Sequence, residues 1–261
     1  MLDGGFQGAQ AGSMNQDHRH FAEKLEELKG RLLTMGGLAE ERSRLVMRAL
    51  VDRNSGWLQD VITGDSRIDD LQIDIDDRCF TLLALHQPVA IDLRTVVSAL
   101  KINADLERVG DLAVNIAEAA ERYILHPPVK PLIDLPRMGE LALKMLRESL
   151  DAFVARDVAL AQEVLRQDDW LDALKDQIFR ELLTYMLGDP RTIEPAVDLI
   201  LIARHLERVG DHATNIAEDV IFIVDARDVR HRTAGPIAAG GQVAAMATTV
   251  ERRRNTGTAP V

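Results

Sequence analysis

Apolar residues recur at helical spacing, three and four positions apart, through most of the chain. The first run predicts one long helix from about residue 17 to 52. Turn residues follow at 54–56, and a second apolar run predicts a helix that continues to His86. A proline inside a helix removes a hydrogen bond, so Pro88 ends that pattern, and a third helix is predicted over about 90–125.

A second set of helices follows a linker. Four prolines predict a Pro-rich linker over residues 127–136. Beyond it the same spacing predicts three more helices, near 137–155, 158–187 and 192–229. Aromatic residues make up only 4% of the chain, which disfavours a strand-rich fold. The sequence therefore predicts an all-α fold with one three-helix bundle over 17–126 and another over 137–231.

The two ends of the chain lack this pattern. Residues 1–16 are rich in Gly, Gln and Ala without helical periodicity, which predicts a flexible N-terminal segment or a tag before a native start at Met14. Residues 232–261 have no apolar stripe, so they cannot bury enough surface to offset the entropy of ordering. We expect a disordered tail there.

An internal repeat relates the two predicted bundles. Residues 106–118 and 206–218 are identical at 11 of 13 positions, at an offset of 100. Residues 49–69 and 152–172 match at 7 of 21 positions, at an offset of 103. A duplication explains this self-similarity, with the second half three residues shorter before its last helix.

Charge and cysteine content narrow the possible functions. The formal net charge of −11 repels nucleic acid and anionic lipid and favours cations or basic partners. The single cysteine, Cys79, excludes an intramolecular disulfide framework and lies at core spacing. No stretch approaches 18 uninterrupted apolar residues, and the N-terminus has no basic leader, so we expect a cytoplasmic protein without membrane insertion.

The repeated window places carboxylates on one stripe of a helix. At 100° per residue, Glu107, Asp111, Asn115 and Glu118 fall within about 80° of each other, opposite the apolar face. One such Glu-x-x-x-Asp pair is typical of a solvated helix surface. Like charges four residues apart destabilise a helix, however, and both copies keep the pair, which favours a bound cation. The candidate metal ligands are Glu107, Asp111, Glu207 and Asp211.

The same helical geometry bears on other histidine, glycine and acidic positions. His205 and His212 point away from Glu207, so we interpret them as interior or interface histidines. Gly110 and Gly210 lie in mid-helix, where glycine is costly, and predict a close approach by a neighbouring helix or a ligand. A second acidic stripe fits either helix surface or groups that support a metal site. It consists of Asp65, Asp69 and Asp76, and it is echoed in the second half by Asp168, Asp172 and Asp176.

The repeated LERVGD…NIAE and the HQPVAIDLR segment before the third helix resemble the PhoU family over roughly residues 17–231. The resemblance implies two tandem, similar three-helix bundles of the up-down-up, spectrin-repeat-like kind, with an acidic motif in each. It also implies a cytoplasmic, non-catalytic negative regulator of phosphate uptake and phosphate-starvation signalling. The implied partners are the Pst phosphate ABC transporter, a PhoR-type sensor histidine kinase and a second copy of the chain, as a homodimer.

For the metal, the resemblance implies divalent or trivalent ions, either iron or zinc clusters or magnesium or manganese, and leaves their identity open. Two other functions remain to be compared. A carboxylate-bridged metalloenzyme needs Glu-x-x-His on facing helices, and no Glu in this chain has His three residues later. A metal-free helical scaffold would use the repeated window as a docking surface instead.

Overall fold

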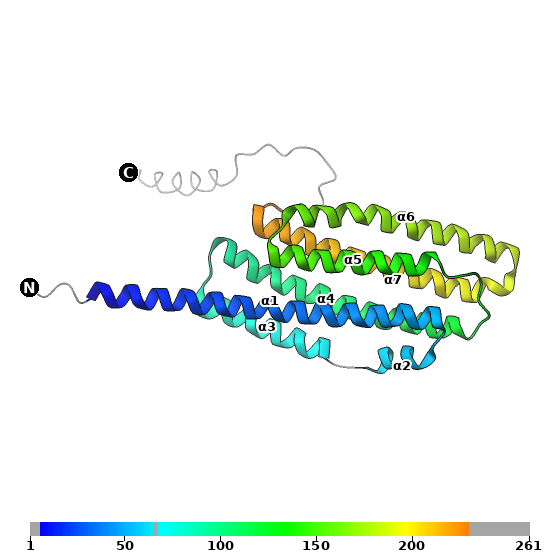
Figure 1. Ribbon diagram of the computed structural model, residues 1–261, viewed down its shortest axis with the longest axis horizontal. Coiled ribbons are helices and arrows are strands. Elements are labelled where there is room, and N and C mark those ends of the chain that lie inside the picture. Colours follow the sequence, from blue (N-terminus) through cyan, green and yellow to red (C-terminus); the bar gives the residue numbers. More distant parts are fainter. Residues whose placement is uncertain (1–5, 65–66, 230–261) are drawn as a thin grey trace, which may run out of the picture. The chain divides into compact units, whose positions relative to one another are not determined.

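The computed structural model describes the backbone of residues 6–64 and 67–229, and side chains from Arg19 onward (Figure 1). All regular structure in these ranges is helical, as predicted. The first half contains α1 (Phe6–Asp52), α2 (Ser55–Thr63), α3 (Arg67–His86) and α4 (Ala90–Ile124). The second contains α5 (Asp134–Ala155), α6 (Val158–Gly188), the short 3-10 turn η1 (Pro190–Thr192) and α7 (Ile193–Asp225). The predicted pair of helical bundles is confirmed, while the predicted tail over 232–261 lies outside the described residues.

The duplication is visible in the turn that ends the first helix of each half. Arg53 and Arg156, equivalent at the offset of 103, both adopt a left-handed backbone, with φ of 53° and 54°. The next residue in each half caps the following helix: the side chain of Asn54 accepts from the amide of Trp57, and Asp157 accepts from the amide of Leu160. The same local sequence signal therefore produces the same turn twice.

The prediction of a single second helix that continues to His86 is wrong, because the helix is interrupted at Gly64. Gly64 is extended, with φ −81° and ψ 151°, and a Cβ there would overlap the carbonyl oxygen of Asp60. Arg42 of α1 donates to the carbonyl oxygens of Val61 at 2.9 Å and Gly64 at 3.1 Å, which holds the freed helix end. Apolar periodicity continues across the break, which is why the pattern alone did not reveal it.

Three other boundaries differ from prediction. α1 begins at Phe6 rather than near residue 17, in a stretch that contains Gln and Ala, which have good helix propensity, as well as Gly8 and Gly12, which do not. α5 begins at Asp134, so Pro136 is in its first turn, where a missing amide hydrogen costs little, and the linker ends earlier than residue 136. α7 ends at Asp225 rather than near 229, since Ala226 adopts a left-handed cap with φ 55°.

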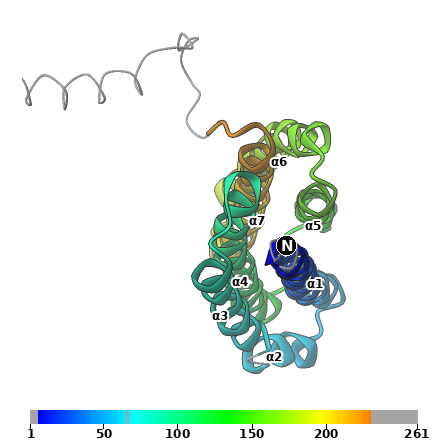
Figure 2. The ribbon, with the colours of Figure 1, turned by 90° about the vertical axis from the view of Figure 1, so that its left-hand side faces the viewer.

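The two bundles share one core and pack against each other with approximate two-fold symmetry. Gly36 of α1 faces Leu150 of α5, and its counterpart Gly139 of α5 faces Met47 of α1. Each half therefore presents an equivalent glycine to a side chain of the other half, and we call the space beside each of these glycines a notch. Because the earlier glycine faces the later side chain in both pairs, α1 and α5 run antiparallel. α4 and α7 also pack along each other, across from α1 and α5 (Figure 2).

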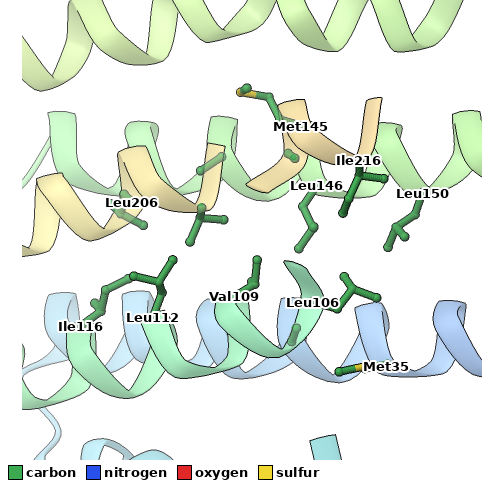
Figure 3. Packing of buried hydrophobic residues seen from close by; sticks show 14 of the residues in the cluster. Met35, Leu106, Val109, Leu112, Ile116, Met145, Leu146, Leu150, Leu206 and Ile216 are labelled. Atoms are coloured by element: carbon green, nitrogen blue, oxygen red, sulfur yellow. The ribbon is translucent and has the colours of Figure 1, made fainter. Parts of the chain in front are cut away.

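Buried aliphatic side chains fill the space between these four helices. Val109 of α4 points toward Leu146 of α5 (Figure 3). The labelled neighbours are all buried: Met35, Leu106, Leu112, Ile116, Met145, Leu150, Leu206 and Ile216. Cys79 is also buried, as predicted, and burial raises the pKa of its thiol to about 12, which keeps it unreactive. None of the described helices has the length and apolar character needed to cross a bilayer.

Polar side chains tie α4 to α7 at the edges of this core. Nδ1 of His212 lies 2.8 Å from Oδ1 of Asp105, and the side-chain amide of Asn215 donates to the same oxygen at 3.2 Å. His212 is therefore an interface histidine, as predicted. At the offset of 100, Asp105 corresponds to His205 and His212 to Leu112. The equivalent pair, Leu112 on α4 and His205 on α7, therefore has no carboxylate. Nδ1 of His205 is buried without a hydrogen-bond partner among the described residues.

We expect His212→Leu to lower the free energy of unfolding by about 1–2 kcal/mol, because the largely buried Asp105 carboxylate loses a hydrogen bond. Urea denaturation at pH 7 measures this loss. His205→Leu is the matched control and should cost less, since Nδ1 of His205 gives up no bond. Equal losses for the two variants would contradict this account of the interface.

Candidate functional site

The first acid site consists of Asp69 on α3 with Glu107 and Asp111 on α4. The side chain of Glu107 is 20% exposed and that of Asp111 is 50% exposed. Burial raises the pKa of Glu107, and the charges of Asp111 and Asp69 raise it further against the opposing effect of Arg108. The two motif acids therefore lie on the outer side of α4, as predicted, and α3 brings a third carboxylate toward them.

Arg108 partly compensates the first acid site from within its own helix. Its guanidinium lies 3.5 Å from Glu107 and 3.2 Å from Asp111. The Arg108 side chain is 61% exposed, and ion pairs this exposed contribute little to stability. This arginine can swing into solvent and leave the carboxylates to another cation.

The second acid site consists of Asp168 and Asp172 on α6 with Glu207 and Asp211 on α7. Burial, together with the charges of Asp172, Asp211, Asp169 and Glu207, raises the pKa of Asp168 to about 6. Desolvation, followed by the charge of Glu207, also raises the pKa of Asp211. These shifts show that the four carboxylates repel each other and that the site has an excess of negative charge.

Lys175 of α6 lies within the second acid site. Its Nζ is 2.9 Å from Oδ1 of Asp172 and 2.9 Å from Oε1 of Glu207. Because Glu207 and Asp172 hold the ammonium group, the pKa of Lys175 is well above its usual value. An internal cation thus bridges one acid from each of the two helices.

Glycines bring the two helices of each site together. At Gly110 an added Cβ would lie 3.0 Å from Cδ1 of Ile68 on α3, and at Gly210 it would overlap Leu171 on α6. The prediction that these glycines admit a neighbouring helix is confirmed. At Gly210 the same Cβ position is 3.6 Å from Oδ1 of Asp168, so this close approach also brings an acid of α6 against α7.

Sequence reasoning placed the motif acids on the correct face and left open whether the second acidic stripe is plain helix surface or supports them. The structure brings Asp69, Asp168 and Asp172 to the motif acids, whereas Asp76 accepts a hydrogen bond from Asn103 at 2.9 Å and belongs to the packing of α3 on α4. Asp65 lies outside the described residues. Lys175 was missed, although it follows Asp172 by three residues, a spacing that favours an ion pair on a helix.

The donors at both sites are carboxylate oxygens, which suit hard cations such as magnesium, manganese, calcium or iron. In the described parts of the chain, no three His, Cys, Asp or Glu side chains are arranged so that they could hold a metal ion as they stand. A bound ion would therefore require some of these carboxylates to reorient toward each other. The charge and the donor chemistry fit a cation.

The fold and these sites define a helical protein of two bundles related by duplication, each with an acid site between its last two helices, α3 and α4 in the first and α6 and α7 in the second. The PhoU domain matches residues 32–120 and 135–220. The chain belongs to the PhoU family.

Similar proteins match over most of their length. The phosphate-specific transport system accessory protein PhoU homologue of Caulobacter vibrioides is 43% identical over 205 residues, which are 78% of this chain and 89% of that one. The homologue from Aquifex aeolicus is 41% identical over 209 residues, which are 80% of this chain and 95% of that one. The crystal structure of PhoU from Pseudomonas aeruginosa matches with a TM-score of 0.76 at 39% identity, covering 79% of this chain and all 100% of that one.

The phosphate transport system regulatory protein PhoU of Streptococcus pneumoniae has a solved structure that matches with a TM-score of 0.74 at 29% identity. It covers 80% of this chain and 99% of that one. These matches extend across both bundles, so the resemblance seen in the motifs is confirmed for the fold as a whole.

Proposed function

We propose that this protein is a cytoplasmic accessory protein that negatively regulates phosphate uptake and phosphate-starvation signalling. The observation that supports this most strongly is the match of both bundles to PhoU domains, together with relatives described as accessory proteins of phosphate-specific transport. The protein acts by contact rather than by catalysis, through helix surfaces held rigid by one shared core.

The proposed partners are the Pst phosphate ABC transporter and a PhoR-type sensor histidine kinase, and the active form is a homodimer. Contacts with the two partners would shift with the transport state, so that the kinase receives information about phosphate supply. The net charge of −11 favours basic partner surfaces over nucleic acid.

Metal ions are proposed to bind at Glu107 and Asp111 in the first bundle and at Glu207 and Asp211 in the second. The ions would be divalent or trivalent. They would be iron or zinc in clusters, or else magnesium or manganese. When bound, an ion supplies positive charge that neutralises an acidic helix face. The chain's own contribution is to hold carboxylates of two helices within reach of each other, which the raised pKa values of Glu107, Asp168 and Asp211 support.

The alternative is a metal-free scaffold, and one observation favours it. Arg108 and Lys175 already pair with carboxylates of the two acid sites, so the faces are partly compensated without an ion. Elemental analysis of protein purified without chelator separates the two possibilities.

A deletion strain tests the regulatory function. Expression of a phosphatase gene that is induced by phosphate starvation reports this signalling. We expect loss of the gene for this protein to raise phosphatase expression in phosphate-rich medium, and a plasmid copy of the wild-type gene to restore repression of the phosphatase gene. The wild-type protein should also co-purify with the solubilised transporter and kinase. Unaltered repression in the deletion strain would refute the proposed function.

A further inference from the structure

Apolar side chains are exposed near the turn that joins α6 to α7. Phe179 and Leu183 of α6 are 47% and 41% exposed, and Ile193 and Val197 of α7 are 44% and 42% exposed. Residues four positions apart lie on one side of a helix, so each pair forms a stripe. α6 and α7 pack along each other and are joined by η1, which forms a hairpin. We call these four residues, together with the half-buried Ile200, the hairpin patch.

The two stripes belong to one surface. Phe179 from α6 and Ile200 from α7 line the same hollow of about 280 Å³, with Ala203 between them and the core. Asp176 and Arg204 also line this hollow. Single exposed apolar side chains are ordinary, whereas a contiguous group around a hollow is typical of a surface that contacts another protein.

Charges around the hairpin patch balance, which bears on what can cover it. Arg191 pairs with Asp189 at 2.8 Å, and the hollow has one base, Arg204, and one acid, Asp176. The chain as a whole carries a net charge of −11, so two copies repel each other over most of their surfaces. At the hairpin patch two copies can approach without this repulsion, and the patch has no excess charge that would select a charged partner.

The equivalent surface of the first half differs in charge. At the offset of 103, α6 has Phe179, Arg180 and Leu183 where α3 has Asp76, Asp77 and Phe80. Phe80 is 59% exposed, so an apolar side chain is present in both halves. The first half has acids in place of the aromatic side chain and the base, however. Two copies that met at that surface would bring like charges together.

We propose that the hairpin patch is the surface through which a second copy of this chain docks, about a two-fold axis. The inference rests on the homodimer proposed above and names its contact. In such a dimer the same residues of both copies meet, so each pair of stripes is buried against the other and each hollow receives a side chain. Phe179 is the expected anchor, because large aromatic side chains in the centre of a contact contribute most to binding.

Sedimentation velocity of the full-length chain at several concentrations measures this self-association. We expect Phe179→Ala to weaken the dimer at least about thirtyfold. Leu183→Asp should leave only monomer, because it would bury an unpaired carboxylate in the contact. The matched control is Phe80→Asp, which introduces the same charge at the equivalent and more exposed position of α3 and should leave the dimer intact. Circular dichroism checks that each variant keeps its helicity.

A charge variant tests the difference between the halves without removing an apolar side chain. Arg180→Asp gives α6 the charge that α3 has at Asp77. It should weaken the dimer about fivefold or more at low salt, and added salt should reduce this effect. Asp77→Asn is the control on α3 and should not change the dimer.

Three results would overturn the inference: a wild-type protein that sediments as a monomer at every concentration, a dimer that persists in Leu183→Asp, or a dimer that dissociates equally in Phe80→Asp. The deletion strain separates this inference from the regulatory function. A monomeric Leu183→Asp protein that restores repression would support the contact and refute the homodimer as the active form. Unaltered repression in the deletion strain, with a wild-type protein that dimerises through the hairpin patch, would refute the regulatory function alone.

Discussion

Leu106→Ala is expected to lower the free energy of unfolding by about 3–5 kcal/mol and to loosen both bundles together. Leu106 of α4 is fully buried, and both it and Leu150 of α5 lie beside the notch at Gly36 of α1. One side chain therefore fills space that belongs to both halves. Its truncation leaves a cavity in the shared core, which a close-packed interior cannot easily close.

Hydrogen exchange followed by mass spectrometry measures this effect in each half. Peptides from α3 and from α6 should both exchange faster in Leu106→Ala, in step with the loss of stability seen by urea denaturation. Leu187→Ala is the control, because Leu187 is 80% exposed on α6 and its loss should change stability by no more than about 0.5 kcal/mol. Faster exchange confined to α3 would mean that the bundles unfold independently.

Asp168→Asn should stabilise the metal-free protein at pH 7.5 by about 1–2 kcal/mol, after allowance for solvent screening. Asp168 has a pKa of about 6 in the folded protein, above its usual value of 3.8. Between these two pH values the folded state holds a proton that the unfolded chain has released, so stability falls as pH rises. Above pH 6 the full penalty of burying this charge among other carboxylates is present, and Asn removes it.

The pH dependence provides the check. Urea denaturation in chelator should show the gain of Asp168→Asn at pH 7.5 and none near pH 4, where Asp168 is protonated when folded. Asp151→Asn is the matched control, since Asp151 is exposed on α5 and is not among the charges that act on Asp168. A gain that is the same at both pH values would contradict the electrostatic explanation.

Periodicity and repetition predicted the helices, the duplication and the outward face of the motif acids. They worked because a buried helix face and a duplicated segment leave regular signals in one dimension. The break at Gly64 does not interrupt the apolar spacing, and its geometry involves the carbonyl oxygen of Asp60 and Arg42, 22 residues away. The contributions of Asp168 and Lys175 likewise depend on how α6 lies against α7, which spacing along one helix does not describe.

The reciprocal notches of α1 and α5 resemble the self-complementary contact of a symmetric dimer, in which identical surfaces meet about a two-fold axis. Identical subunits must change both faces whenever one residue mutates. Joining the halves in one polypeptide removes that constraint. Gln72 could then diverge from its equivalent Lys175, and His205 from its equivalent Asp105. A fused ancestor could in this way evolve two halves with different side chains while it kept the packing of a symmetric dimer.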